Sequence, residues 1–158
     1  MRKHKRIILS GPTASGKTYI RNKFKEKGFI NEVSYTSREA RPDEIDGVDY
    51  HFISKDEFLK RLNNSEFYEY TQYNGNHYAT GVKEWNECEI FVMETDGLKT
   101  ILLEDKADCV FIYVDTPKEI RVKRMYERGW DQSKILSRID TDEIKFKNFT
   151  DYDFKISS

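Results

Sequence analysis

The chain has 158 residues, a length that fits one compact domain with small mobile insertions better than two independent domains. Its 27 Lys and Arg residues nearly balance 28 Asp and Glu residues, so the formal charge is −1 and no basic surplus favours a role at nucleic acids or membranes. Only 37% of the residues are hydrophobic, but aromatic residues reach 14% and supply much of the area that a core can bury. Because the net charge is close to zero, any binding of anions must depend on a local group of basic residues.

The cysteines and the N-terminus indicate the compartment. Cys88 and Cys109 stand far apart without a C-x-x-C pair, which favours a reducing compartment and a buried apolar role for each. The basic start, Met1–Arg6, resembles the beginning of a signal peptide, but the apolar run Ile7–Leu9 is too short for export. No window approaches the roughly 18 apolar residues of a membrane span. We therefore expect a soluble, cytoplasmic protein, with no nucleic-acid or membrane partner.

The first elements along the chain are a strand, a glycine loop and a helix. The apolar run Ile7–Ser10 predicts a strand that stops at Gly11-Pro12. Lys17–Lys27 has helical spacing and is followed by Gly28, a natural C-cap.

The next stretch predicts a small α+β insertion. Val48–Phe52 alternates like a strand, and Ser54–Glu57 has the capping-box pattern that opens a helix. Phe67–Tyr73 and Asn76–Thr80 then flank Asn74-Gly75, the strongest short hairpin signal.

The rest of the chain alternates strands and helices, which indicates parallel connections and an α/β fold. The Thr116–Glu119 run combines an N-cap, Pro at N1 and Glu at N3. The expected elements are strand Glu89–Met93, helical stretch Leu98–Glu104, strand Cys109–Val114, a helix from 117 to about Arg128, a helix over about 132–147 and a strand at Asp153–Ile156.

The strongest chemical signal lies between the first strand and helix, where residues 11–18 satisfy G-x-x-x-x-G-K-[ST] at every fixed position. Such a loop turns backbone N–H groups around phosphate oxygens at the positive end of a helix. Lys17 would reach the β/γ phosphates and the Thr18 hydroxyl would ligate Mg²⁺; the alternative is a chance glycine turn with an exposed lysine. The predicted ATP-binding residues are Gly11, Ala14, Ser15, Gly16, Lys17 and Thr18.

Four further motifs follow in order: Ser34–Pro42 (SYTSREARP), Asp46–Phe52 (DGVDYHF), Glu66–Tyr70 (EFYEY) and Gly75–Thr80 (GNHYAT). Together with the loop they resemble the guanylate kinase family over about residues 6–140. The resemblance implies the fold of a P-loop nucleoside monophosphate kinase: a parallel-sheet core (1–33 and 81–158), an α+β acceptor-binding lobe (34–80) and a helical lid (about 124–140).

The resemblance also implies roles for seven lobe residues. The acceptor monophosphate would be held by Arg38, Arg41, Tyr50 and Tyr78, and guanine would be read by Ser34, Glu69 and Thr80. Residue chemistry agrees, because arginine forks and phenols suit a dianionic phosphate, while a carboxylate accepts from both donors on the guanine edge. Taken singly, the arginines could instead form surface ion pairs and the tyrosines could pack as aromatics.

Acidic residues follow the strand Glu89–Met93. Glu94 and Asp96 would face the acceptor nucleotide and would order Mg²⁺ through water, where the family has Asp-x-Asp and a later glycine. Either both residues replace that pair with a shortened loop, or Glu94 alone occupies the second position. Asp96 has a helix N-cap as its alternative.

Three arginines, Arg124, Arg128 and Arg138, surround Gly129–Asp131 and resemble the lid arginines that close over ATP in this family. With Lys17 they are the expected catalytic residues, because positive charge stabilises the transferring phosphoryl group. The alternative is a solvated helix face. Lys118, Arg121 and Lys123 are expected to be surface charges, and His4, His51 and His77 lack metal-ligand spacing.

These observations predict phosphoryl transfer from Mg·ATP to GMP or dGMP. A kinase of this fold with another or broader acceptor, or an inactive protein-binding module, would be the alternatives; such modules typically lose the phosphate loop. The stretch between Thr80 and Glu89 is short for the family, no helix follows the last strand, and Ser157-Ser158 stands where the family has Asn-Asp near adenine. Contacts to the donor base and the oligomeric state stay open.

Overall fold

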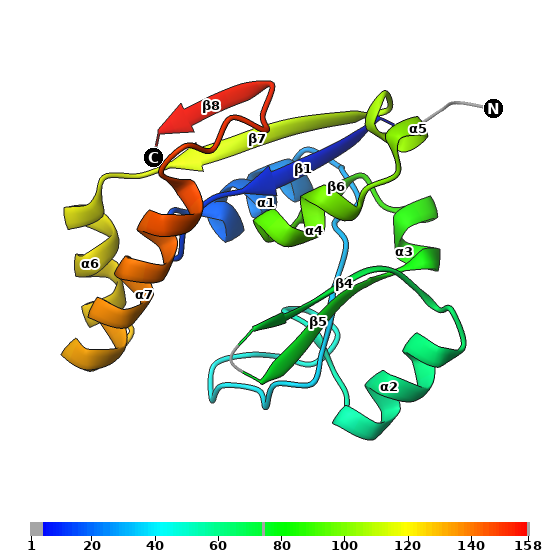
Figure 1. Cartoon of the computed structure of the whole chain (residues 1–158), viewed down its shortest axis with the longest axis horizontal. Helices are drawn as coiled ribbons and strands as arrows, with labels where there is room; N and C mark the ends of the chain where they lie inside the picture. The colour runs from blue at the N-terminus through cyan, green and yellow to red at the C-terminus, as the bar shows by residue number, and fades with distance from the viewer. Residues whose placement is uncertain (1–4, 74, 158) are drawn as a thin grey trace.

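The computed structural model describes residues 5–73 and 75–157 and contains two separate four-stranded sheets (Figure 1). All strands of the first sheet are parallel, in the order β6 (Ile90–Val92), β1 (Arg6–Ser10), β7 (Cys109–Asp115) and β8 (Phe154–Ser157). Ile8 of the central strand pairs with Phe91 on one side and Phe111 on the other. The expected α/β fold with a parallel-sheet core is confirmed.

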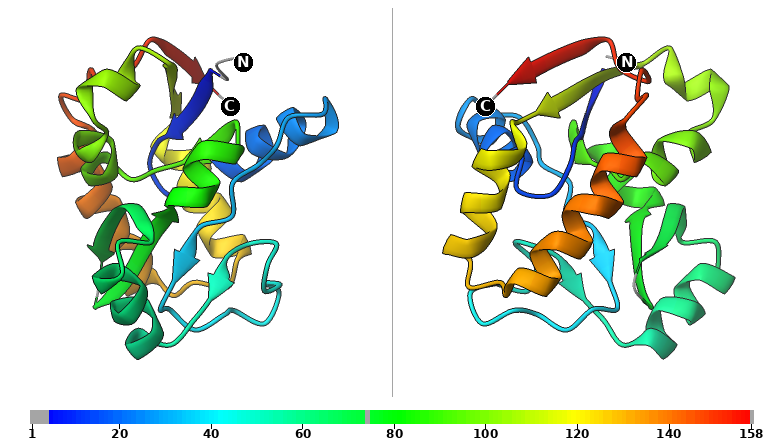
Figure 2. Two further views of the ribbon diagram at one scale, coloured as in Figure 1. Left: turned by 90° about the vertical axis from the view of Figure 1, so that its right-hand side faces the viewer. Right: turned by 60° about the vertical axis from the view of Figure 1, so that its left-hand side comes forward.

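Helices connect and surround this sheet. Two of them, α6 and α7, lie side by side and follow the carboxyl end of β7 (Figures 1 and 2). The helices outside the second sheet are α1 (Lys17–Glu26), α3 (Val82–Glu87), α4 (Thr95–Thr100), α5 (Leu103–Lys106), α6 (Lys118–Glu127) and α7 (Gln132–Phe146).

The second sheet lies at the opposite end of the molecule from β7 and β8 (Figure 2). Its order is β3 (His51–Phe52), β2 (Tyr35–Thr36), β5 (Asn76–Gly81) and β4 (Phe67–Tyr73). The helix α2 (Lys55–Asn63) begins as the capping box predicts, with Ser54 accepting a hydrogen bond from the Glu57 amide at 3.1 Å. The predicted hairpin is present, although Asn74 of its turn lies outside the described residues.

Several local predictions need correction. The helix α6 is capped by Pro117 rather than Thr116, because the Thr116 hydroxyl instead donates to the Ser15 carbonyl at 2.7 Å. The helical stretch Leu98–Glu104 divides between α4 and α5, with Leu102 extended between them. A further helix, α3, occupies the stretch that separates Thr80 from Glu89, where no helix was predicted.

The main core packs beneath the first sheet around Trp85 and Phe91. Tyr68 of β4 stacks on Trp85 with ring centroids 4.0 Å apart, which joins the second sheet to the core. Cys109 is buried as predicted, whereas Cys88 is only half-buried. Among the described residues, no helix combines the length and the apolar character needed to cross a bilayer.

At Gly11, which begins the phosphate loop, there is no space for a side chain. A Cβ atom at Gly11 would collide with the Val114 carbonyl oxygen, which belongs to the central sheet and cannot move away. At Gly81 the obstacle is the flexible Glu84 carboxylate. We therefore expect Gly11→Ala to lower the free energy of unfolding by about 1–3 kcal/mol and Gly81→Ala to lower it less.

Chemical denaturation of both variants measures this difference. Equal losses would mean that the loop relaxes around the added methyl group.

Candidate functional site

The phosphate loop joins β1 to α1. Its chain is bent by positive φ angles at Ala14 (62°) and at Gly16 (100°), the residue that caps α1. The Lys17 ammonium donates to the carbonyls of Gly11 at 2.5 Å and Pro12 at 3.0 Å, so it lies over the loop. Burial lowers the pKa of Lys17, and the charges of Glu94 and Asp142 act in the opposite direction.

One buried carboxylate, Asp142 of α7, links this loop to the helices beside it. Its Oδ2 accepts a hydrogen bond from the Thr13 amide at 2.8 Å. Its carboxylate oxygens lie 3.6 Å from Nε of Arg138 and 3.8 Å from a terminal guanidinium nitrogen of Arg121. Arg138 also donates through Nε to the Thr13 hydroxyl. Backbone and side chain of one loop residue are therefore both held by α7.

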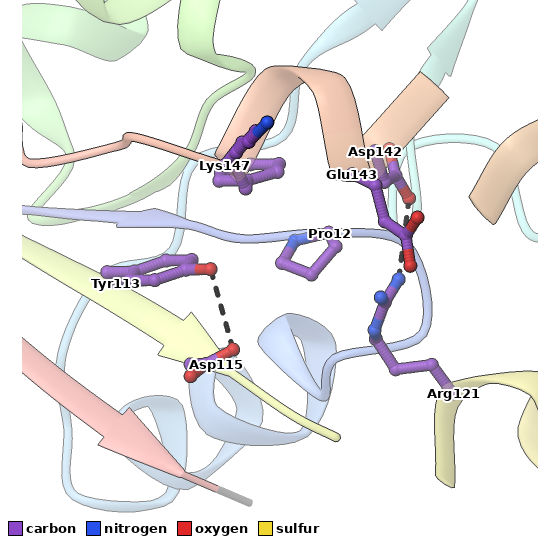
Figure 3. A pocket seen from close by; sticks show the side chains of 8 residues that line it. Pro12, Tyr113, Asp115, Arg121, Asp142, Glu143 and Lys147 are labelled. Atoms are coloured by element: carbon purple, nitrogen blue, oxygen red, sulfur yellow. Dashed lines mark hydrogen bonds and ion pairs between the residues drawn. The ribbon is translucent and has the colours of Figure 1, made fainter. Parts of the chain in front are cut away.

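Arg121 is not the surface charge that the sequence predicts. Its side chain is only 7% exposed, its Nε donates to the Thr116 carbonyl at 3.1 Å, and it points toward Asp142 across a hollow of about 180 Å³ beside Pro12 (Figure 3). The reason is its position: Arg121 precedes Arg124 by three residues, so it shares the face of α6 that packs on the phosphate loop. Lys118 does lie at the surface, where it pairs with Glu143 at 3.1 Å.

Arg124 of α6, Arg128 at the end of that helix and Arg41 of the loop after β2 lie within electrostatic range of one another. Arg124 donates to the Ala14 carbonyl at 2.9 Å, which brings α6 onto the loop. Desolvation and then the charges of Arg41 and Arg124 lower the pKa of Arg128. The Arg41 guanidinium in turn lies 5.6 Å from the Trp130 ring, and Lys134 lies 4.0 Å from it on α7. Carboxylates also lie near these cations: Glu44 is 3.9 Å from Arg41, and the charges of Asp43 and Asp131 act on Arg128 and Lys134.

In the loop between β2 and β3, Arg38 is held by Glu44. Both guanidinium nitrogens of Arg38 donate to the two carboxylate oxygens, at 2.9 and 3.0 Å, and the Arg41 amide donates to the same carboxylate at 2.8 Å. Tyr50 lies 5.5 Å from the Arg38 guanidinium and 6.0 Å from the Tyr78 ring. Burial, followed by the neighbouring Tyr78, raises the pKa of Tyr50 to about 12, so this phenol stays a neutral donor.

A second group lies at the base of the β4–β5 hairpin. The Thr80 hydroxyl donates to Glu69 Oε1 at 2.9 Å, and Glu69 Oε2 approaches Gly97 of α4 so closely that a Cβ there would lie 2.8 Å away. Burial raises the pKa of Glu69 to about 6. Ser34 lies beyond it and donates to Glu32 Oε2 at 2.9 Å. Of the three predicted base-reading residues, Thr80 therefore contacts Glu69 directly, and Ser34 is linked to them through Glu32, on which the Glu69 charge acts.

The two acidic candidates after β6 differ in position. Glu94 lies 3.7 Å from Arg138 and 3.7 Å from Lys145, and its charge acts on Lys17. Asp96 is exposed in the first turn of α4, and Glu94 caps that helix. Thus the structure brings Glu94 to the phosphate loop and leaves Asp96 outside the contacts of the site.

A magnesium ion bound with a nucleotide fits this arrangement. Thr18 is exposed in the first turn of α1, so its hydroxyl is accessible, and Glu94 is only half-buried. Mg²⁺ prefers oxygen ligands and usually keeps waters and substrate phosphates with only one or two protein groups. A hydroxyl and one carboxylate are a donor set of that kind.

Three contributors were missed by sequence reasoning. Glu44 follows Arg41 by three positions and Asp142 follows Arg138 by four, so both spacings were visible as ion-pair signals. Tyr73, whose ring lies 4.2 Å from the Arg138 guanidinium, gave no such signal because the hairpin and α7 are far apart in sequence.

Comparisons with known proteins agree with this geometry. A family model described as guanylate kinase matches residues 3–158. The chain is 32% identical to the guanylate kinase of Lactococcus lactis subsp. lactis, over 95% of the chain and 78% of that protein. For Latilactobacillus sakei subsp. sakei the identity is 36%, over 92% of the chain and 78% of that protein. The chain belongs to the guanylate kinase family.

The fold gives the same result. A crystal structure of guanylate kinase from Anaplasma phagocytophilum superposes with a TM-score of 0.72, over 97% of this chain and 76% of that one, at 22% identity. This likeness confirms the predicted fold of a P-loop kinase. As a member of the guanylate kinase family, the protein is a nucleoside monophosphate kinase, and therefore a phosphotransferase.

Because Asp142 joins the loop to α6 and α7, its charge should matter for stability and for activity. We expect Asp142→Asn to lower the free energy of unfolding by about 3–5 kcal/mol, since breaking a buried ion pair leaves uncompensated charge. The same change should raise the KM for ATP, because the Thr13 amide loses its charged acceptor.

Asp140→Asn is the matched control, because Asp140 is exposed on the same helix. Thermal unfolding and steady-state kinetics of both variants test the expectation. Similar behaviour of the two would show that Asp142 does not hold the loop.

Proposed function

We propose that the protein transfers the γ-phosphoryl group of ATP to the phosphate of GMP or dGMP, giving ADP and GDP or dGDP. Its relatives are named guanylate kinases, and the chain carries both a complete phosphate loop and the lid arginines. The family's ATP-dependent phosphoryl transfer sets the reaction class. The residue roles below are our assignment for this chain.

The observation that carries the proposal is that the charges of Arg41, in the loop between β2 and β3, and of Arg124 on α6 both act on Arg128, which directly follows α6. Like charges at such close range repel one another unless an anion lies between them. The phosphates of two nucleotides, one on the loop and one in the acceptor lobe, supply those charges. The cluster thus belongs at the phosphate-to-phosphate junction of the reaction.

On the acceptor side, Arg38 and Arg41 hold the monophosphate, with Tyr50 and Tyr78 as neutral donors. Glu44 keeps the Arg38 fork in place by two hydrogen bonds and so reduces its freedom before the nucleotide binds. The Glu69 carboxylate accepts from the two donors of the guanine edge, and the hydroxyls of Ser34 and Thr80 complete the recognition.

On the donor side, the loop from Gly11 to Thr18 cradles the ATP phosphates through its amides. Lys17 lies over the loop and balances charge on the β and γ phosphates. Thr18 and Glu94 would hold a magnesium ion bound with the nucleotide, and such an ion neutralises phosphate charge. No covalent enzyme intermediate is required, because positioning and electrostatic stabilisation account for phosphoryl transfer.

Movement of two segments would close the site. We assign residues 34–80 as the acceptor lobe, about 124–140 as the lid, and 1–33 and 81–158 as the core. Arg41 of the lobe already lies over Trp130 of the lid, which in turn contacts Lys134. Closure along this contact excludes water and suppresses hydrolysis of ATP.

Guanine recognition by Glu69 gives a direct test of the function. In a coupled ADP-release assay, we expect GMP and dGMP to exceed AMP and dTMP by at least roughly 10²-fold in kcat/KM, because adenine would leave the buried carboxylate unpaired. Glu69→Gln should reduce this preference. Since burial raises the pKa of Glu69 to about 6, the KM for GMP should rise as the pH falls from 7 to 5 and the carboxylate gains a proton.

Glu66→Gln is the control, since Glu66 is exposed and precedes β4. Efficient phosphorylation of AMP or dTMP by the wild type, or a larger effect at Glu66 than at Glu69, would refute the guanine assignment.

Arg128 tests the lid. Its side chain is exposed, so Arg128→Ala should leave the fold intact and, by removing like-charge repulsion, should not lower the melting temperature. Turnover should fall by about 10²–10³-fold with little change in either KM, because the charge acts in the closed, reacting complex. Lys123→Ala, an exposed charge on the same helix, should keep its kcat. A kcat for Arg128→Ala close to the wild-type value would show that Arg128 is a solvated surface charge without a catalytic role.

A further inference from the structure

Beside the base-reading residues lies a carboxyl group that the reaction described above does not use. Glu32 is only 3% exposed, and its Oε2 accepts a hydrogen bond from the Ser34 hydroxyl at 2.9 Å. The two residues lie two positions apart in the extended stretch before β2, so their side chains project from the same face. Among the described residues, the other oxygen, Oε1, is buried without a hydrogen-bond partner.

The groups facing Glu32 come from several elements. Arg21 of α1 contributes a positive charge, while Glu69 of β4 and Glu84 of α3 contribute negative charges. The Cys88 thiol, which follows α3, also lies within range of the carboxyl. The surroundings therefore contain two carboxylates against one arginine, which makes a further full negative charge at Glu32 unfavourable.

The hydrogen bond to Glu32 limits what Ser34 can do. A hydroxyl has a single hydrogen. If Ser34 gives that hydrogen to an ionised Glu32, its oxygen presents only lone pairs to the nucleotide, and lone pairs repel the carbonyl oxygen O6 of guanine. If Glu32 is protonated, its own O–H can donate to the Ser34 oxygen, which frees the serine hydrogen for O6.

We propose that Glu32 is a positioning residue for guanine recognition: its protonation state determines whether the Ser34 hydroxyl donates a hydrogen bond to O6 of the acceptor base or turns away from it. This inference rests on the proposed function, because it takes Ser34 as a guanine contact. No bond is made or broken other than the transfer of the carboxyl proton to and from solvent.

The electrostatics place the change of state near physiological pH. Burial raises the pKa of Glu32 to about 8, and the nearby Glu69 and Glu84 charges add to this rise. Below that value the acid is neutral and Ser34 is free to donate. Above it, the carboxylate takes the serine hydrogen and binding of guanine weakens. Affinity for GMP should therefore fall as the pH rises from 7 to 9.

Glu32→Gln separates this effect from ionisation of the nucleotide. The amide has nearly the same shape, donates to Ser34 at every pH and cannot ionise, so it mimics the protonated acid. We expect the Kd of GMP by calorimetric titration, and its KM, to be equal in wild type and Glu32→Gln within about twofold at pH 7. At pH 9 the wild-type values should be larger by roughly five- to tenfold. The KM for ATP should not change with Glu32.

Two further measurements distinguish positioning from a structural role. In a Ser34→Ala background, Glu32→Gln should have no effect on GMP binding at either pH, because the hydroxyl through which it acts is absent. Thermal unfolding should show the titration itself. The native state holds the proton that the unfolded chain releases near pH 4.5, so from about pH 5 to pH 8 the stability of the wild type should fall relative to that of Glu32→Gln.

The outcomes are separable. A wild-type-to-variant ratio of GMP affinity that is constant from pH 7 to 9 overturns the inference and leaves the kinase assignment intact. The inference is likewise overturned if Glu32→Gln acts equally with and without Ser34, or if the two melting profiles stay parallel. Absence of GMP phosphorylation by the wild type at pH 7 would overturn the proposed function, and the inference with it.

Discussion

The site depends on one buried carboxylate, Asp142. It lies 129 positions along the chain from Thr13, yet it accepts a hydrogen bond from the Thr13 amide. It also forms ion pairs with Arg121 of α6 and Arg138 of α7. A buried charge is tolerated only when its partners are complete, so loop, α6 and α7 form one electrostatic unit. Displacement of α6 from Asp142 would leave charge uncompensated next to the loop.

Beyond that unit, positively charged side chains gather between the end of α6 and the loop after β2. Glu44 pairs with Arg38 at 2.9 Å and lies 3.9 Å from Arg41, and the charge of Arg41 is close enough to lower the pKa of Arg128. In the proposed function, the phosphate groups of the two nucleotides relieve the repulsion between Arg41 and Arg128. Closure of the site and exclusion of water would then depend on both nucleotides being bound.

Local signals in the sequence predicted most of the fold. The strand–loop–helix around residues 11–18, the Ser54 cap and the β4–β5 hairpin all depend on residues within a few positions of one another. Arg121 was misjudged because its burial depends on Asp142, 21 positions away, and no local pattern reveals that pairing. Likewise, the spacing E-T-D-G left Glu94 and Asp96 open as alternatives. Only the way α4 packs against β4 separates them, since it turns Asp96 to solvent. The sequence therefore did not predict which charged side chains become buried, because their burial depends on contacts between distant parts of the chain.

At the proposed guanine site, burial affects the protonation of two carboxyl groups and, through it, the choice of base. Glu32 is buried and Glu69 is half-buried, and the two carboxyls lie within range of each other, yet their pKa values are raised to different levels, about 8 and about 6. The Thr80 hydroxyl and amide support the charged form of Glu69, whereas Glu32 has a single serine as its hydrogen-bond partner. A pH between those two values favours the charged form of Glu69 and the neutral form of Glu32. In the proposed function this combination suits guanine, because its edge has two donors for a carboxylate and one acceptor for a hydroxyl that must itself be free to donate.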